Sequence, residues 1–525
     1  MIARRWIALG ILAGAVIVLR APSLAVPILN EDEALYAAIA ANMAEGRPPY
    51  RAGVESKPPG IFYLYEAGFA IFGRYAMRAL HALTMLWVLG TALLVGGIAR
   101  RAVPGSPAPP DRVLTVSLVA SLLYLGFTIV EEPAVMATQC ELMYSLPLAA
   151  AAWLVIRACT GVGRSGWLLL VLAGVLCGAG TLIKPTAISL PVAASAWLVV
   201  RRPVLRGPAP LLVDAARALA IWAGFLIAWL CAFGYFSRLG VWDDLVYWAF
   251  RWTLGTYIPT GTAHSPFLLR FVSGFCVWIG LTAILWILSS VAVRARLARP
   301  APTDSPAQVT SLLVAWVLAA TALTFLGGRF FDHYFPAVIP GLAALAAAGF
   351  EAVRDRVAWR RAVAITVIVP VVACWAGTWQ IERTKAWFGE PPRPYDEIAS
   401  YVHDRSGADD RVFVWGYFPV LYVAAGRLAA TRYVGCHYLT GYAAIGLGRD
   451  LPPEVEDPLG VPGGFAILLA ELERDRPVLL VDTAPADLHH WRRYPLARYP
   501  DLATYVAAHY VHEATVQGAA IYRRR

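Results

Sequence analysis

Long apolar runs separated by short polar connections occupy the chain up to residue 378. The runs lie at 6–29, 77–99, 113–130, 139–157, 167–183, 187–200, 212–236, 267–293, 309–327, 335–350 and 362–378. A helix needs about 20 mostly apolar residues to cross a bilayer. The pattern therefore predicts a mainly α, polytopic membrane protein of about 11 transmembrane helices.

Beyond residue 378 the pattern becomes mixed and polar. Residues 394–404 have helical spacing, whereas 411–415 and 477–482 are short apolar runs typical of strands. Alternating helices and strands are typical of an α/β domain. We therefore predict a transmembrane domain at 1–378 and a small C-terminal extracytoplasmic α/β domain at 379–525.

The composition excludes an ordinary soluble protein. Hydrophobic residues make up 58% of the 525 residues and charged residues 15%, and the mean hydropathy is +0.57. The net charge of +10 does not indicate nucleic acid binding, because the basic residues form short clusters between apolar runs, as in cytoplasmic loops. These clusters predict a multi-pass protein of the inner (plasma) membrane, with a cytoplasmic N-terminus and the C-terminal domain outside.

Five basic residues fall on the outer side of this topology: Lys57, Arg74, Arg78, Lys184 and Arg329. Each could snorkel to lipid headgroups or pair with a nearby acid. Their concentration on one side favours an anionic ligand instead.

The first outer loop, residues 30–76, begins with an acidic cluster. Asn30 is a good helix N-cap, and Glu33 stands three residues later, where a capping box places its acid. Capping explains Glu33 better than it explains Asp32, which is one carboxylate more than a cap needs. The helix that follows has Leu35, Ile39 and Met43 at helical spacing, which predicts an amphipathic helix on the membrane surface.

Several motifs of this chain resemble those of GT-C glycosyltransferases. The first loop combines the acidic pair, Lys57-Pro58-Pro59, an aromatic run at 61–65, Phe72-Gly73 and Arg78. The glycine-rich run that ends at Lys184-Pro185 and the segment at 328–336, which contains Arg329, His333 and Tyr334, are also similar to the family. Within it, the chain looks most like the branch of protein O-mannosyltransferases and the lipid A aminoarabinose transferase.

This resemblance implies a glycosyltransferase of the cell envelope, acting in glycosylation on the extracytoplasmic face. Its donor would be a sugar on a polyprenyl phosphate, and its acceptor a glycan, lipid or protein. The implied catalytic residues are Asp32 as general base, Glu33 beside it and Glu141 as a second acid, with Glu131 and Glu132 close enough to compete for that last role. Lys57, Arg78, Lys184 and Arg329 would bind the donor phosphate, together with His333 and Tyr334.

Other interpretations stay open at this stage. The chain could be a transporter or flippase of lipid-linked sugars, or it could transfer a larger lipid-linked glycan. No histidine or cysteine spacing forms a metal motif, so the metal site is unknown and a divalent cation held by acids stays open. In the tail, five aromatic residues could contact sugar or acceptor: Tyr417, Phe418, Tyr422, Tyr433 and Tyr438. Core packing is the favoured interpretation, and no catalytic residue is assigned there.

Overall fold

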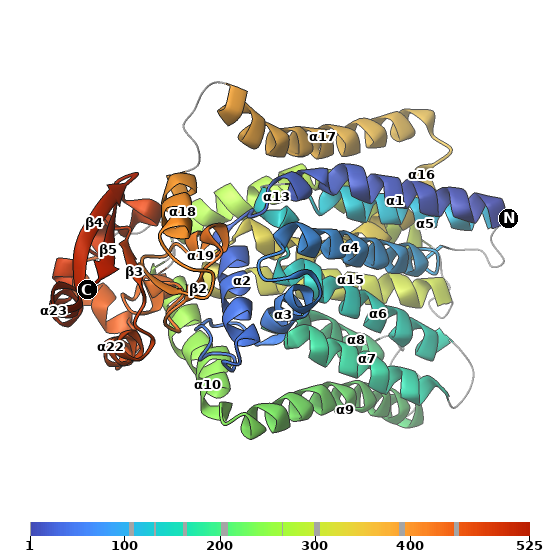
Figure 1. Ribbon diagram of the computed structural model, residues 1–525. Helices are drawn as coiled ribbons and strands as arrows, with labels where there is room; N and C mark the ends of the chain where they lie inside the picture. The colour runs from blue at the N-terminus through green and yellow to red at the C-terminus, as the bar shows by residue number, and fades with distance from the viewer. Residues whose placement is uncertain are drawn as a thin grey trace.

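The computed structural model describes residues 2–103, 110–130, 133–160, 165–200, 208–264, 266–298, 305–387, 394–445 and 451–525. Figure 1 shows a set of long helices running roughly side by side, with a small sheet and its helices packed at one end. The long helices are α1 (Ile2–Ala25), α4 (Met77–Ala99), α5 (Pro110–Phe127), α6 (Cys140–Thr160), α7 (Ser165–Thr181), α8 (Ser189–Val200), α9 (Pro208–Arg238), α14 (Ala283–Leu297), α15 (Ser305–Thr324), α16 (Ile339–Val353) and α17 (Val357–Trp387).

Within the described ranges, four helices are long and apolar enough to cross a membrane: Ala3–Ala25, Met77–Ala99, Cys140–Cys159 and Leu211–Arg238. A fifth span results if Trp242–His264 and Phe267–Leu281, which are bent by 90°, count as one. The other apolar helices of the described part are 10–17 residues long and shorter than a bilayer requires. The prediction of a mainly helical, multi-span protein is confirmed, whereas the number 11 stays a prediction.

Glycines bring some of these helices into direct backbone contact. A Cβ built on Gly174 of α7 would lie 1.9 Å from the Ile221 carbonyl of α9, and one on Gly224 of α9 would lie 1.9 Å from the Val171 carbonyl. Small residues allow this close approach, which stabilises helix pairs where lipid offers no hydrophobic driving force. The contact joins the middle of α7 to α9.

Two short helices follow α1 in the outer loop: α2 (Glu31–Ala44) and α3 (Gly60–Phe72). Residues 34–41 of α2 are all 0% exposed. The expected amphipathic surface helix is therefore wrong, because α2 is covered on all sides. It packs against α3 and against the C-terminal elements α19 (Val420–Ala425) and β2 (Leu428–Ala429), and it lies between the long helices and the sheet (Figure 1).

The C-terminal part contains a five-stranded sheet in the order β2-β1-β3-β5-β4. The strand β1 (Arg411–Trp415) pairs in parallel with β2 and with β3 (Leu479–Asp482), and β5 (Ala519–Arg524) pairs antiparallel with β3 and with β4 (Tyr510–Val516). The helices α18 (Pro394–Asp404), α22 (Gly464–Asp475) and α23 (Pro500–His509) accompany it. Both strands and the helix predicted from the sequence are confirmed.

Candidate active site

The acidic cluster lies at the N-terminus of α2. The Asn30 side chain accepts a hydrogen bond of 2.8 Å from the Glu33 amide, as predicted for an N-cap. Asp32, in the first turn, is not used by the cap. Its Oδ2 accepts a hydrogen bond of 3.2 Å from the Tyr36 hydroxyl, and the helix N-terminus further favours its negative charge.

Lys57 comes back to this carboxylate from the connection between α2 and α3. Its Nζ lies 3.5 Å from Asp32 Oδ2 and 3.2 Å from Glu55 Oε1, and 5.1 Å from the centre of the Tyr36 ring. The Lys57 side chain is 18% exposed, and that of Asp32 is 22% exposed. Asp32 and Lys57 thus meet in a part-buried place, as expected for two residues of the same loop. The contact of Lys57 with Glu55 was not predicted from the sequence.

A second ion pair joins two residues that lie 43 positions apart. Lys184, just after α7, pairs with Glu141 in the first turn of α6, and its Nζ lies 4.2 Å from the centre of the Tyr334 ring. The Glu141 side chain is only 1% exposed, and its Oε2 is buried without a hydrogen-bond partner in the described structure. Glu131 and Glu132, the competing acids, lie outside the described residues.

These groups form one charged cluster, which we name the acid–lysine cluster: Asp32, Lys57, Glu141, Lys184 and His333. Burial would raise the pKa of Asp32, but the charges of Lys57 and Lys184 outweigh it and hold this pKa well below its usual range. Burial lowers the pKa of His333 to about 4, so its ring is neutral at physiological pH. The cluster therefore offers an ionised carboxylate beside two ammonium groups.

Glu33 is fully occupied by protein contacts. Its Oε2 accepts from the Leu29 amide at 3.1 Å, while its Oε1 accepts from the Thr138 amide at 3.0 Å and lies 2.7 Å from His81 Nε2. The side chain is 0% exposed. The Glu33 carboxylate thus links three segments: the connection after α1 through Leu29, the first turns of α4 through His81, and the connection before α6 through Thr138. These contacts favour a positioning role, which the capping pattern anticipated in part.

Arg329 contacts the C-terminal part and not the acid–lysine cluster. Its guanidinium donates to the carbonyls of Ala444, Ile445 (3.1 Å) and Tyr257 (3.2 Å), and it stacks 4.0 Å from the centre of the Tyr257 ring. Arg329 is 2% exposed. These contacts favour a structural tie between the outer loops and the tail over the predicted role in phosphate binding.

Replacing Arg329 with lysine should loosen this tie. A lysine keeps the charge but cannot reach several carbonyls at once in a planar fork. We expect faster protease cleavage of the tail and an unfolding midpoint several degrees lower, while the affinity for a polyprenyl phosphate, the ligand class that the resemblance implies, stays unchanged. Limited proteolysis, thermal unfolding and a binding titration measure these three quantities. A weaker affinity for the lipid with an intact tail would instead support the phosphate role.

Arg78 also points elsewhere. Its Nε donates to the Leu24 carbonyl at the end of α1 at 3.1 Å, and the residue is exposed. The fifth outer cation, Arg74, pairs with Glu45 at 2.8 Å and donates to the Ala408 carbonyl of the tail. Of the predicted phosphate ligands, Lys57 and Lys184 are those the structure brings to Asp32, with His333 and Tyr334 beside them.

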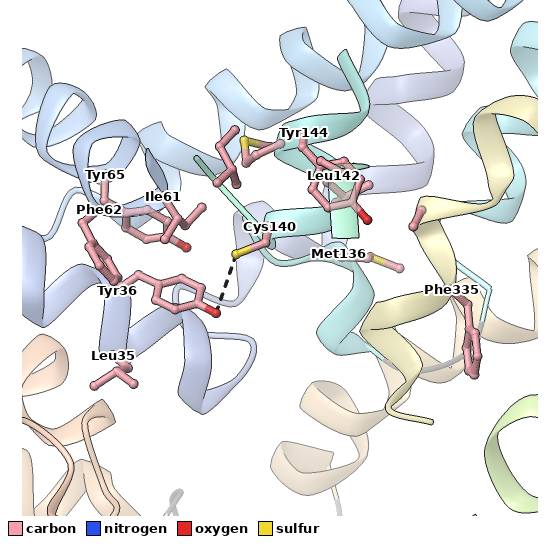
Figure 2. Close-up of a cluster of buried hydrophobic side chains, with 14 of the residues drawn as sticks. Leu35, Tyr36, Ile61, Phe62, Tyr65, Met136, Cys140, Leu142, Tyr144 and Phe335 are labelled. Atoms are coloured by element: carbon pink, nitrogen blue, oxygen red, sulfur yellow. Dashed lines mark hydrogen bonds between the residues drawn. The ribbon is translucent and has the colours of Figure 1, made fainter. Parts of the chain in front are cut away.

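Aromatic side chains of α2 and α3 pack beside the cluster. Figure 2 shows Tyr36 of α2 against Phe62 and Tyr65 of α3, with its hydroxyl directed toward Cys140 at the start of α6. The Tyr36 ring centre lies 6.1 Å from that of Phe62 and 5.8 Å from that of Tyr65. Because these rings are buried, the Tyr36 hydroxyl is held in one place beneath Asp32.

The tail reaches the same site, which the sequence analysis missed. The Tyr417 hydroxyl lies 3.4 Å from Asp32 Oδ1, and the Tyr438 hydroxyl accepts from the Ser56 amide at 3.0 Å. His489 Nε2 lies 3.2 Å from Glu31 Oε1. Core packing therefore does not fully describe Tyr417 and Tyr438, because both hydroxyls also contact the segment that carries Asp32 and Ser56. No spacing in the sequence could reveal these contacts, since nearly 400 positions separate the two segments.

In the ranges that the structure describes, no three His, Cys, Asp or Glu side chains are grouped so that they could hold an ion. Asp32 and Glu141 each face a lysine, whose ammonium group takes the place that a cation would have beside them.

Comparisons with known proteins found a matching family profile and similar folds. Residues 56–229 match the family profile described as dolichyl-phosphate-mannose-protein mannosyltransferase. The fold is similar to that of ArnT from Cupriavidus metallidurans bound to undecaprenyl phosphate, with 16% identity, a TM-score of 0.60, and 99% of this chain and 98% of that chain covered. It is also similar to that of the Archaeoglobus fulgidus oligosaccharyltransferase AglB, solved with an inhibitory peptide and a dolichol-phosphate. The identity is 12% and the TM-score 0.53, and the match covers 99% of this chain and 74% of that chain.

The comparison with curated protein sequences gave no match. The family match covers residues 56–229, and the fold similarity extends over nearly the whole chain. The resemblance predicted from the first outer loop is confirmed: this chain has the fold of the GT-C glycosyltransferases.

Proposed function

We propose that the protein transfers a sugar from a polyprenyl phosphate carrier to an acceptor hydroxyl on the extracytoplasmic face of the membrane. The observation that carries this proposal is the acid–lysine cluster, in which Asp32 lies 3.5 Å from Lys57 and within electrostatic reach of Lys184. The cluster lies where the long helices meet the tail. We retain the division into a transmembrane domain at 1–378 and an extracytoplasmic domain at 379–525.

The chemistry needs the two signs of charge that this cluster provides. The acceptor hydroxyl gives its proton to Asp32, and its oxygen forms a bond to the anomeric carbon of the sugar. The bond from that carbon to the phosphate oxygen breaks, and the carrier phosphate leaves with the electron pair. Lys57 and Lys184 then stabilise the charge that develops on the phosphate.

Donor binding also strengthens the base. In the free protein the neighbouring cations hold the pKa of Asp32 low, which makes it a weak proton acceptor. A phosphate bound at Lys57 and Lys184 shares these cations and adds negative charge, so the pKa of Asp32 rises. The carboxylate thereby accepts a proton more readily once the carrier is in place.

The comparisons support the carrier class. ArnT was solved with undecaprenyl phosphate and AglB with a dolichol-phosphate, and the matching family profile names a dolichyl-phosphate-mannose donor. Undecaprenyl phosphate and dolichol-phosphate share one chemistry, a phosphate on a long polyprenyl chain. We infer that this chain uses such a carrier, with a hexose or a pentose as the transferred sugar.

The test is a mass-spectrometric comparison of polyprenyl-linked sugars and envelope glycans in host cells with and without this chain. We expect one lipid-linked sugar to accumulate and one envelope sugar to disappear when the chain is deleted, and both to return on complementation. The mass of the accumulated lipid distinguishes a monosaccharide donor from a larger glycan. If purified protein in liposomes moves a labelled lipid-linked sugar without forming a covalent product, the transferase proposal is wrong and a flippase is indicated.

A further inference from the structure

Three separate segments of the C-terminal part converge on the start of α2. Tyr417 follows β1, His437 lies in the short helix Cys436–Tyr438, and His489 lies in Leu488–Arg493. The ring centres of Tyr417 and His437 are 4.2 Å apart, and those of Tyr417 and His489 are 6.2 Å apart. We name these three residues the tail face. Through Tyr417 the tail face touches Asp32, and through His489 it touches Glu31.

The two oxygens of Asp32 have different surroundings. Oδ2 accepts from Tyr36 at 3.2 Å and faces Lys57 at 3.5 Å, so it lies on the side of the cations. Oδ1 faces Tyr417 at 3.4 Å, which is long for a hydrogen bond between oxygens. A carboxylate oxygen with one weak partner keeps a lone pair for another donor. The acceptor hydroxyl therefore has its place at Oδ1, on the side of the tail.

His437 adds a buried imidazole whose hydrogen-bonding capacity the protein uses only in part. It is 7% exposed, and its Nδ1 is buried without a hydrogen-bond partner in the described structure. Burial lowers the pKa of His437 to about 3, while the charge of Asp32 and a backbone hydrogen bond with Gly435 act on this pKa in the opposite direction. The ring is therefore neutral and offers one N–H donor and one lone pair. An unpaired polar atom at such a place costs stability, which a bound polar ligand would recover.

The segment that carries His489 has a strained backbone. Asp487, His489 and His490 have φ values of 52°, 53° and 60°, a region that residues other than glycine rarely adopt. Such strain persists where the surrounding structure requires it, and it is concentrated at functional sites. Here it holds His489 against Glu31. The two side chains are 27% and 36% exposed, so this edge of the site is open to water.

We propose that the tail face forms the acceptor side of the transfer site, in which Tyr417 orients Asp32 and His437 hydrogen-bonds a polar, hydroxyl-bearing acceptor. This inference rests on the proposed function. The acceptor enters at the water-exposed edge beside His489 and Glu31, and its hydroxyl lies against Asp32 Oδ1. The phosphate of the donor occupies the opposite side, at Lys57 and Lys184. Tyr417 is a positioning residue, since it acts through Asp32.

The test uses purified full-length protein and a detergent extract of membranes from host cells lacking this chain, which supplies the native donor and acceptor. The variants Tyr417→Phe and His437→Phe keep the ring packing but remove the hydroxyl or the ring nitrogens. Tyr433→Phe is the matched control, because Tyr433 is a buried tail tyrosine whose pKa is set by groups other than Asp32. The readouts are the initial rate of lipid-linked sugar loss, the affinity for undecaprenyl phosphate and the thermal unfolding midpoint.

We expect Tyr417→Phe and His437→Phe each to lower the rate about tenfold, the scale of one hydrogen bond to a charged or buried group. Their affinity for undecaprenyl phosphate and their unfolding midpoint should match those of the control. Unchanged rates would overturn the proposal. So would a parallel loss of rate and carrier affinity, which indicates general damage to the site. Asp32→Asn is measured alongside: if it transfers sugar at the native rate, the proposed function itself fails.

Discussion

Replacing Asp32 with asparagine should lower the rate of sugar transfer by more than about 100-fold, the usual contribution of a general base. Asparagine has nearly the same shape and can still accept a hydrogen bond from Tyr36, but it cannot take the acceptor proton. The cap of α2 uses Asn30 and Glu33 instead, so the helix should remain intact. The measurement is the rate of lipid-linked sugar loss per folded molecule, in the membrane extract used for the tail variants.

Asp244→Asn serves as the control for this experiment. Asp244 is a carboxylate that pairs with Arg51 at 3.1 Å, and it does not belong to the acid–lysine cluster. We expect its rate to equal that of the native protein. If Asp32→Asn keeps full activity at native protein levels, the acidic cluster is only a helix cap. The flippase interpretation would then become the stronger one.

Replacing Lys184 with methionine should have two separate effects. It leaves the Glu141 carboxylate, 1% exposed, without its partner, and an uncompensated buried charge costs about 3–5 kcal/mol of unfolding free energy. It also removes a cation from the phosphate side. On the scale of one oxyanion donor, this should lower the rate about 100- to 1000-fold. Thermal unfolding and the transfer rate per folded molecule measure the two effects.

A double variant separates stability from chemistry. Adding Glu141→Gln to Lys184→Met removes the uncompensated charge, so most of the lost stability should return. The transfer rate and the affinity for undecaprenyl phosphate should stay low, because the cation is still missing. A double variant that recovers the native rate would show that Lys184 only neutralises Glu141. Lys57 would then be the remaining candidate for the phosphate.

Local sequence was sufficient to locate the start of the site. Asn30 and Glu33 have the spacing of a cap, and the structure places both where that spacing requires. Because Asp32 belongs to the same helical turn and Lys57 to the next connection, their meeting needs only a short stretch of chain. The strand at 411–415 and the helix at 394–404 could also be predicted from nearby residues, since the spacing of hydrophobic positions indicates each element without knowledge of its neighbours in the fold.

The sequence was less reliable where burial depends on distant elements. The spacing of Leu35, Ile39 and Met43 suggested one apolar face on α2, but the opposite face is covered by the tail. The count of about 11 spans stays a prediction, since four helices, or five with the bent pair, are long and apolar enough to cross a membrane in the described ranges. Hydropathy measures composition and not the contacts that a helix makes.

The sequence by itself determined the helical membrane part, the α/β tail, and the acidic turn with its lysine, because each depends on residues close along the chain. Only the tertiary structure decided which cations serve the site. Lys184 reaches Glu141 because α6 and α7 pack against each other, while Arg329 is held by carbonyls of the tail. The approach of Tyr417 to Asp32 depends on how the tail packs against α2, and packing between distant surfaces leaves no periodic pattern in the sequence.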